Sequence, residues 1–163
     1  MTDQSGASVS EAVVDLLGAL RYAQLSGFEA LAADAQMTPH LRAKMAFARM
    51  GVEMFHRCEQ VGVRLGELGM SQEQAMTPFV AAVDAFHERS KPSDWLEGIV
   101  KAYVGDGIVR DFSTEMAAHL DPANRAFMTR MLTNAGGADA IVDEVRLATP
   151  GHPRLGARLA RWA

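Results

Sequence analysis

Apolar residues recur along almost the whole chain at the three- and four-residue spacing of amphipathic helices. No window alternates convincingly between apolar and polar residues, which is the pattern of a half-buried strand. The sequence therefore predicts an all-α protein. Capping residues, prolines and glycines divide it into helices over about residues 10–35, 39–68, 78–88, 94–119 and 122–149, followed by a short helix in the C-terminal LGARLARWA.

The lengths of the connections indicate how these helices are arranged. Four of the helices are long, and short turns near residues 38 and 120 join them into two hairpins. The connection between the hairpins, residues 70–93, is about 24 residues long and contains the short helix. Two hairpins with one long crossover are the ferritin-like form of the four-helix bundle, whereas an up-down bundle has short loops throughout. We therefore predict one ferritin-like domain over residues 10–163, after a flexible N-terminus, residues 1–9.

Charge and cysteine content narrow the class of protein. The 16 Lys and Arg against 20 Asp and Glu give a net charge of −4, which argues against a dedicated nucleic-acid binder. A tRNA-modifying enzyme with a local basic patch stays open. The single cysteine, Cys58, has no intrachain partner. The N-terminus has no signal-peptide pattern, and no apolar run approaches the ~18 residues of a membrane span. We expect a cytoplasmic protein without a membrane segment.

Polar residues interrupt the apolar stripes at one level of the predicted bundle. Gln24, Asp106 and Asn134 fall within the apolar stripes of the first, third and fourth long helices. Each lies about 14 residues from the turn of its hairpin, and Glu53 and His56 lie about 15 and 18 residues from theirs. Because every helical residue adds ~1.5 Å, all four long helices bring a polar group to roughly the same layer.

Metal binding is one function of such a layer. Glu53 and His56 form a Glu-x-x-His pair, whose spacing places both side chains on one helix face. In ferritin-like carboxylate proteins, two such pairs and two further Glu residues hold two metal ions. The candidate metal ligands are therefore Glu53, His56 and Asp106. Tyr103, one turn before Asp106, is a candidate hydroxyl donor from the core to this layer.

Three segments resemble a known family. They are LLGALRYAQLSGFEALAADAQMTPHLRAKMAFARMGVEMFHRCEQ (16–60), DWLEGIVKAYVGDGIVRDF (94–112) and, more loosely, GGADAIVDEVR (136–146). They are similar to actinobacterial ferritin-like proteins related to the 2-methylthio-isopentenyl-adenosine tRNA hydroxylases. The resemblance implies a ferritin-like bundle and, for a complete site, oxygen-dependent hydroxylation of a prenylated tRNA base by iron.

The family pattern is met only in part. Glu53 and His56 match its Glu and His on the second helix, and Asp106 matches an acidic position on the third. Gln24 stands where the resemblance implies a Glu. In the fourth helix, Asn134 and Gly137 stand where it implies an acidic residue and a His.

These departures change the chemistry that is expected of the site. An amide offers one neutral oxygen, so it is a poorer ligand for a hard cation than a carboxylate. The remaining two carboxylates and one His are too few for two ferrous ions and equal the minimum for one open metal site. One iron ion is therefore favoured over two, and a metal-free layer remains equally open. In the metal-free layer, Gln24 and Asn134 are expected to form hydrogen bonds with Glu53, His56 and Asp106. At an iron site they would instead be secondary ligands or donors to the ligands.

Other interpretations of the same residues stay open. Glu53 and His56 lie opposite the most apolar side of their helix, on a face typical of solvated, ion-paired residues. If Glu53 and His56 face the bundle instead, both sides of the helix contact protein, and the apolar side is available for a dimer interface. Asp106 is also placed for an i, i+4 ion pair with Arg110. Arg154, Arg158 and Arg161 form a basic stripe that is more typical of a solvated or dimer-contacting face than of an RNA site.

Three functions follow from these patterns. The leading one is a ferritin-like protein related to the tRNA hydroxylases, with an incomplete di-iron site and either no catalysis or weak metal binding. The second is a working iron- and oxygen-dependent hydroxylase, a monooxygenase that acts on a prenylated tRNA base or another hydrophobic substrate. The third is a helical bundle whose central apolar space binds a small molecule or partner. A homodimer is expected, and tRNA binding has no support from the charge.

Overall fold

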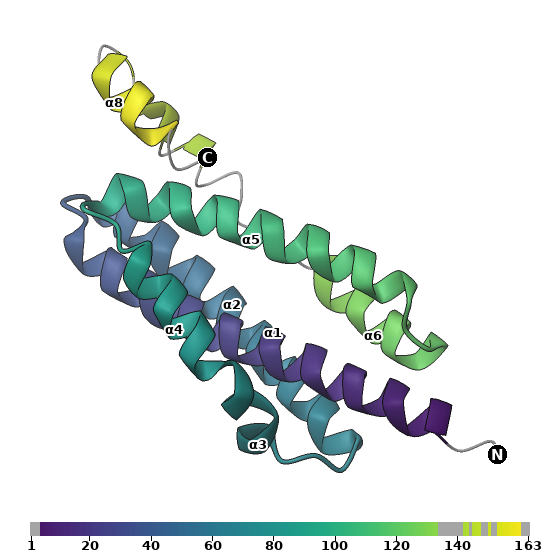
Figure 1. The fold of residues 1–163 in the computed structure, drawn as a ribbon. Coiled ribbons are helices and arrows are strands. Elements are labelled where there is room, and N and C mark those ends of the chain that lie inside the picture. The colour runs from purple at the N-terminus through teal and green to yellow at the C-terminus, as the bar shows by residue number, and fades with distance from the viewer. Residues whose placement is uncertain (1–3, 134–141, 144, 148–149, 151–152, 161–163) are drawn as a thin grey trace.

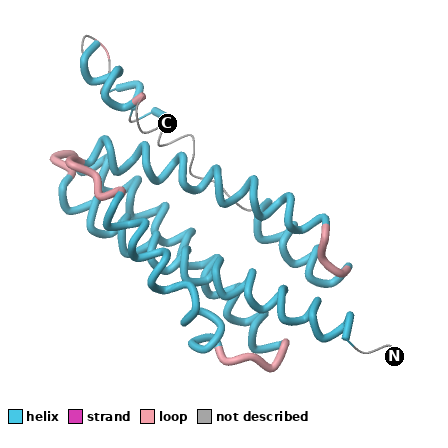
Figure 2. The backbone as a smooth tube through the Cα atoms, viewed as in Figure 1, coloured by secondary structure: helices cyan, strands magenta, loops and turns pink. Residues whose placement is uncertain are grey.

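The computed structural model describes residues 4–133, 142–143, 145–147, 150 and 153–160, and this part of the chain is helical without a strand (Figures 1 and 2). The predicted all-α class is confirmed. The helices are α1 (Gln4–Met37), α2 (Leu41–Glu67), α3 (Gln72–Met76), the 3-10 helix η1 (Thr77–Phe79), α4 (Val80–Arg89), α5 (Trp95–Ala118), α6 (Pro122–Thr133) and α8 (Pro153–Leu159).

Most helix boundaries agree with the sequence signals, because local capping groups set them. The Asp94 side chain accepts hydrogen bonds from the backbone N–H groups of Leu96 and Glu97, both at 3.0 Å, at the start of α5. Asp121 caps α6 in the same way, with Ala123 N at 3.0 Å and Asn124 N at 3.1 Å. Such caps satisfy N–H groups that have no partner inside the helix.

Two boundaries differ from the prediction. Helix α1 begins at Gln4, six residues before the predicted start, because the polar stretch before residue 10 contains no proline to end a helix. The crossover contains α3 and η1 as well as the expected α4, since Ser71 caps an additional helical turn through Gln74 N at 3.3 Å. In the later part of the predicted fourth helix, residues 142–143 and 145–147 are described and helical, whereas Asn134 and Gly137 lie outside the described residues.

The helices form two hairpins joined by the crossover (Figure 1). Helices α1 and α2 pack along each other as the first hairpin, and α5 and α6 form the second. The crossover returns along α1, and α5 also packs on α1. Helix α8 contacts the start of α5, where Arg158 bonds with Asp94 and lies 3.5 Å from Glu97 Oε1. Helix α1 therefore contacts the first hairpin partner, the crossover and the second hairpin.

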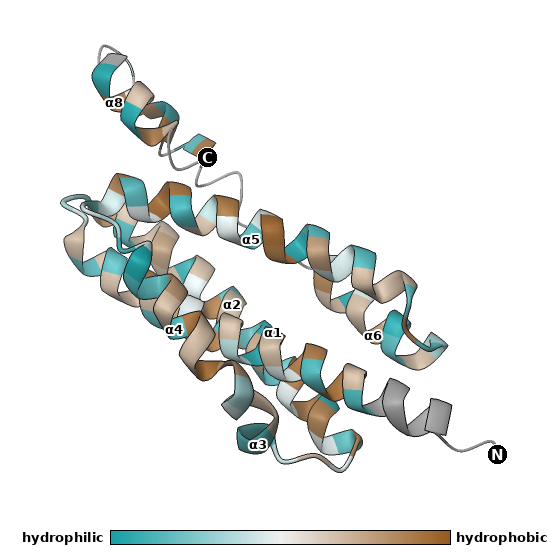
Figure 3. Ribbon diagram, in the orientation of Figure 1, coloured by the Kyte–Doolittle hydropathy of each residue, from teal (hydrophilic) through white to brown (hydrophobic). Residues whose placement is uncertain are grey.

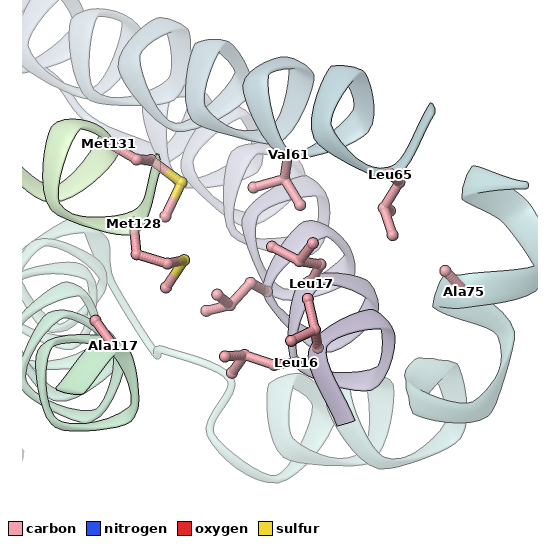
Figure 4. Packing of buried hydrophobic residues seen from close by; sticks show 10 residues of the cluster. Leu16, Leu17, Val61, Leu65, Ala75, Ala117, Met128 and Met131 are labelled. Atoms are coloured by element: carbon pink, nitrogen blue, oxygen red, sulfur yellow. The ribbon is translucent and has the colours of Figure 1, made fainter. Parts of the chain in front are cut away.

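Two apolar clusters form the core. Hydrophobic residues recur along α1, α2 and α5 between hydrophilic ones (Figure 3), and their buried members gather near the two ends of the bundle. The buried residues of the first cluster, drawn as sticks in Figure 4, are Val13, Leu16, Leu17, Leu20, Val61, Leu65, Ala75, Ala117, Met128 and Met131. The second contains Leu31, Ala35, Phe47, Met50 and Ile99.

The apolar side of α2 is part of this core. Phe47, Cys58, Val61 and Leu65 are fully buried, and α2 packs mainly on α1. The expectation that this side is available for a dimer interface is therefore wrong, because α1 already covers it. Within the described residues, no helix is both long and apolar enough to span a bilayer.

The first cluster predicts the cost of a core truncation. Leu17 on α1 is fully buried among residues of α2 and α6. Leu17→Ala should lower the free energy of unfolding by ~2–5 kcal/mol, because it removes buried apolar contacts and leaves a cavity. Denaturant titration measures the loss. The exposed Val52 on α2 supplies the control, since Val52→Ala should change stability by less than ~0.5 kcal/mol. Equal effects of the two changes would contradict the assigned core.

Candidate functional site: a cavity between α1 and α5

A cavity of about 130 Å³ lies between the two core clusters. Helices α1 and α5 form its long walls, and residues of α2, α4 and α6 complete the lining. Most of the lining is apolar, with a few polar side chains. An apolar cavity of roughly 150 Å³ is large enough to hold benzene, so this one has room for about one ring, and because it is partly open to solvent, a short chain on that ring can extend beyond it.

Small residues on both walls create the space. The same i, i+4, i+7 spacing places three of them on the cavity side of each helix, Ala23, Gly27 and Ala30 on α1 and Gly98, Ala102 and Gly105 on α5. A side chain at Gly27 would collide with Met54, and one at Gly98 would collide with Asp34. A Cβ at Gly105 would meet no atom of the described residues within 4 Å. Glycine therefore permits close packing at two positions and leaves open space at the third.

Asp106 lies between two guanidinium groups in the cavity lining. Its Oδ1 accepts a hydrogen bond from Arg57 of α2 at 2.8 Å, and its Oδ2 accepts one from Arg110 at 2.8 Å. The predicted ion pair with Arg110 is confirmed. The pair with Arg57 was not predicted, because a helical wheel of α2 does not show which residue of another helix faces it. Two cations and one anion leave this cluster with a local charge of +1.

Several polar atoms of the lining have no hydrogen-bond partner in the part of the chain that the structure describes. Gln24 is 6% exposed and Ser113 is 0% exposed, which confirms the predicted burial of the Gln24 amide. The Oε1 of Gln24, the Oγ of Ser113 and the Nε atoms of Arg57 and Arg110 are buried and unpartnered. Gln24 donates only a long contact of 3.9 Å to Met131 Sδ. The predicted hydrogen bonds from Gln24 to Glu53, His56 and Asp106 are therefore wrong.

A second polar group, centred on Asp34, lines the cavity near the start of α5. Asp34 is 6% exposed, and burial raises its pKa to about 6, an effect that the positive charge of Lys101 partly offsets. Burial also lowers the pKa of Lys101 and of His87, whose Nδ1 lies 3.4 Å from Lys101 Nζ. Asp34 falls one turn after Leu31 in the apolar stripe of α1, and that spacing is the sequence signal that identifies it.

The candidate metal ligands do not meet at this cavity. Glu53 is half-buried and His56 is exposed, with its Nε2 3.2 Å from Gln60 Nε2, while Asp106 faces Arg57. Across the described ranges, no group of three or more His, Cys, Asp or Glu residues is placed to hold a metal ion. Tyr103 is 46% exposed, so its predicted core position is wrong. Asn134 lies outside the described residues.

Comparison with known proteins identifies the family. Residues 7–163 match the family described as "Ferritin-like domain, actinomycetes". The chain belongs to this family. No curated protein matches the chain.

Ferritin-like carboxylate proteins hold metals with four acidic residues and two histidines that project into the bundle. The described residues of this ferritin-like chain do not fit such a centre. Its cavity presents the Gln24 amide and two carboxylates, Asp34 at one end and Asp106, which two guanidinium groups already neutralise. A metal cation beside Arg57 and Arg110 meets electrostatic repulsion. The arrangement favours an uncharged or negatively charged occupant.

The buried carboxyl of Asp34 predicts a pH dependence of stability. Its folded-state pKa of about 6 lies above the ordinary value of 3.8, so the folded protein binds the proton more tightly than the unfolded chain. This group therefore favours folding at low pH, and the contribution is lost as the pH rises from about 4 to about 6. Asp34→Asn should raise the free energy of unfolding at pH 7 by up to about 3 kcal/mol and change it little at pH 4.

Denaturant titrations at both pH values measure this difference. The control is Asp111→Asn, which removes an exposed carboxylate from the same protein and should have little effect at either pH. If Asp34→Asn raises the free energy of unfolding equally at pH 4 and pH 7, the assignment of a raised pKa to Asp34 is contradicted.

The unpartnered amide of Gln24 predicts a stabilising substitution. Gln24→Met keeps a similar volume and removes a buried oxygen that has no partner, so the free energy of unfolding should rise by about 1 kcal/mol. Thermal or denaturant unfolding measures the change, with Gln36→Met at an exposed position of α1 as the control. A clear loss of stability for Gln24→Met would show instead that the amide belongs to a satisfied polar network.

Proposed function

We propose that this ferritin-like protein binds a small, mainly apolar molecule in the cavity between α1 and α5. The observation that carries the proposal is a mainly apolar cavity between α1 and α5 whose lining includes buried polar atoms without partners among the described residues. This corresponds to the third function that the sequence suggests, a bundle whose central space holds a ligand.

The small residues of the two walls support a binding role. Glycine in a helix costs about 1 kcal/mol relative to alanine, and α5 carries Gly98 and Gly105 on its cavity side. Gly98 is explained by the close approach of Asp34. Gly105 has no neighbour that would exclude a side chain. Because Gly105 lines the cavity, the absence of a side chain there leaves space for a bound molecule.

The unpartnered polar atoms of the lining also support a binding role for the cavity. A buried donor or acceptor without a partner costs about 1–3 kcal/mol, and native proteins retain few of them. Gln24 and Ser113 come from different hairpins and both line the cavity. A bound molecule with a polar group, or a water molecule held beside it, would satisfy these atoms.

The other functional expectations remain predictions from the sequence. They are the relation to tRNA hydroxylases, oxidoreductase activity, iron binding, the homodimer and the cytoplasmic location. The family match supports the ferritin-like fold, and the charges around Asp106 favour ligand binding over metal binding at the cavity.

The experiment uses 3-phenylpropan-1-ol, a neutral molecule with one benzene ring, and follows the amide chemical shifts of the protein during titration. Saturable shifts should concentrate on the stretches of α1 and α5 that line the cavity. Gly105→Leu should weaken binding about tenfold or more, because the new side chain enters the open space beside residue 105.

Gly107→Leu is the matched control. Gly107 lies on the same helix and also has no atom within 4 Å of an added Cβ, but it does not line the cavity. Both substitutions raise helix propensity equally. A difference in binding between the two variants therefore comes from the position of the new side chain relative to the cavity. The proposal fails if the wild-type protein shows no saturable binding, or if the two variants bind the alcohol equally well.

A further inference from the structure

We infer that the cavity selects a monocarboxylate, with the ligand carboxylate bound by Arg57 and Arg110 and the apolar part lying between α1 and α5. This inference rests on the proposed function and adds the chemical class of the ligand. It depends on the hydrogen-bonding state, the charge and the position of the two arginines.

Both guanidinium groups retain unused donors. Arg57 and Arg110 each contact Asp106 through one terminal nitrogen, and their Nε atoms are buried without a partner. A guanidinium has five N–H donors arranged to match a carboxylate in pairs. The two arginines therefore have donors left for a second carboxylate in addition to Asp106.

The charge of the cluster favours an anion. The side chains of Arg57 and Asp106 are 14% and 21% exposed and that of Arg110 is 37% exposed, so water screens the charge of Arg110 more than that of Arg57. A buried charge without a counter-charge is costly, and an opposite charge with hydrogen bonds reduces that cost. A bound carboxylate would give two cations and two anions, which makes the cluster neutral.

Asp106 also positions the two arginines before a ligand arrives. They come from different helices, α2 and α5, and each bonds with one oxygen of the same carboxylate. A site that is ordered in advance loses less conformational freedom on binding. In this proposal Asp106 is a positioning residue that also competes with the ligand for the same donors.

The far end of the cavity limits the ligand to one carboxylate. Asp34 lies beside Gly98, eight residues or roughly 12 Å along α5 from Asp106. Its carboxyl has little solvent around it, so an ionised Asp34 repels a second anionic group there, and the positive charge of Lys101 offsets this repulsion only in part. The walls between the two ends are mainly apolar, which suits a ring or an alkyl chain.

The test compares three probes that share one ring and one three-carbon chain: 3-phenylpropanoate, 3-phenylpropan-1-ol and 3-phenylpropylamine. Each is titrated into the wild-type protein at pH 7.5 and moderate salt, with amide chemical shifts as the readout. The propanoate should bind about tenfold tighter than the alcohol or more, as expected for a charge-assisted hydrogen bond. The amine should bind most weakly.

Two variants in the cluster should shift this selectivity in opposite directions. Arg57→Gln removes one cation and should abolish the preference for the propanoate over the alcohol. Asp106→Asn removes the competing carboxylate and should tighten propanoate binding several-fold, with the alcohol little changed. A metal site would respond to Asp106→Asn in the opposite way, by losing affinity for its cation.

Each variant has a control of equal charge change outside the cavity. Arg89→Gln and Asp111→Asn alter exposed residues that do not line it, and both should leave the selectivity unchanged. Thermal unfolding of every variant confirms that the fold persists. If Arg57→Gln does not fold, Asp106→Asn and the three probes on the wild-type protein still decide the question.

The outcomes separate this inference from the proposed function. If the alcohol binds as tightly as the propanoate, or if the amine binds tightest, the carboxylate assignment is overturned while the binding cavity stands. If none of the three probes binds saturably, both proposals fall. The assignment is supported if the wild-type protein and the two control variants prefer the propanoate. Arg57→Gln should then abolish that preference, and Asp106→Asn should increase it.

Discussion

The packing of α2 on α1 determines the character of the site. Phe47, Val61 and Leu65 are buried on one side of α2, and α1 covers that side. A helix is a rigid cylinder, so burying one side sets the direction of every other residue. Arg57 consequently lines the cavity beside Asp106, while its neighbour His56, about 100° further around α2, is exposed.

The direction in which α2 presents its residues decides which side chains of α2 line the cavity. With Glu53 and His56 away from the cavity, Asp106 has two arginines as partners in place of a second carboxylate and a histidine. The layer therefore carries an excess positive charge, which makes it unsuited to a cation. The small residues of α1 and α5 then leave space beside that charge. The ferritin-like fold thus supplies a central cavity, and the identity of a few side chains decides what the cavity attracts.

Much of the fold was predictable from local signals. Proline, glycine and capping residues act within a few positions along the chain, so the helix starts at Asp94 and Asp121 and the long crossover are visible in the sequence. The burial of Gln24 and the ion pair between Asp106 and Arg110 are also local, because both follow from spacing on a single helix. Periodicity within one helix did not identify Arg57 as the second partner of Asp106, since that contact joins α2 and α5.

The sequence by itself determined the all-α class, the two hairpins and the polar residues that interrupt the apolar stripes. Only the tertiary structure decided which of those residues meet. Tyr103 fits an apolar stripe of α5, yet it is exposed because the neighbouring helices cover a different part of that surface. Asp34 and Lys101 approach each other because α1 and α5 pack closely at Gly98. Helical spacing predicts which residues share a face of one helix, and packing between helices decides what that face contacts.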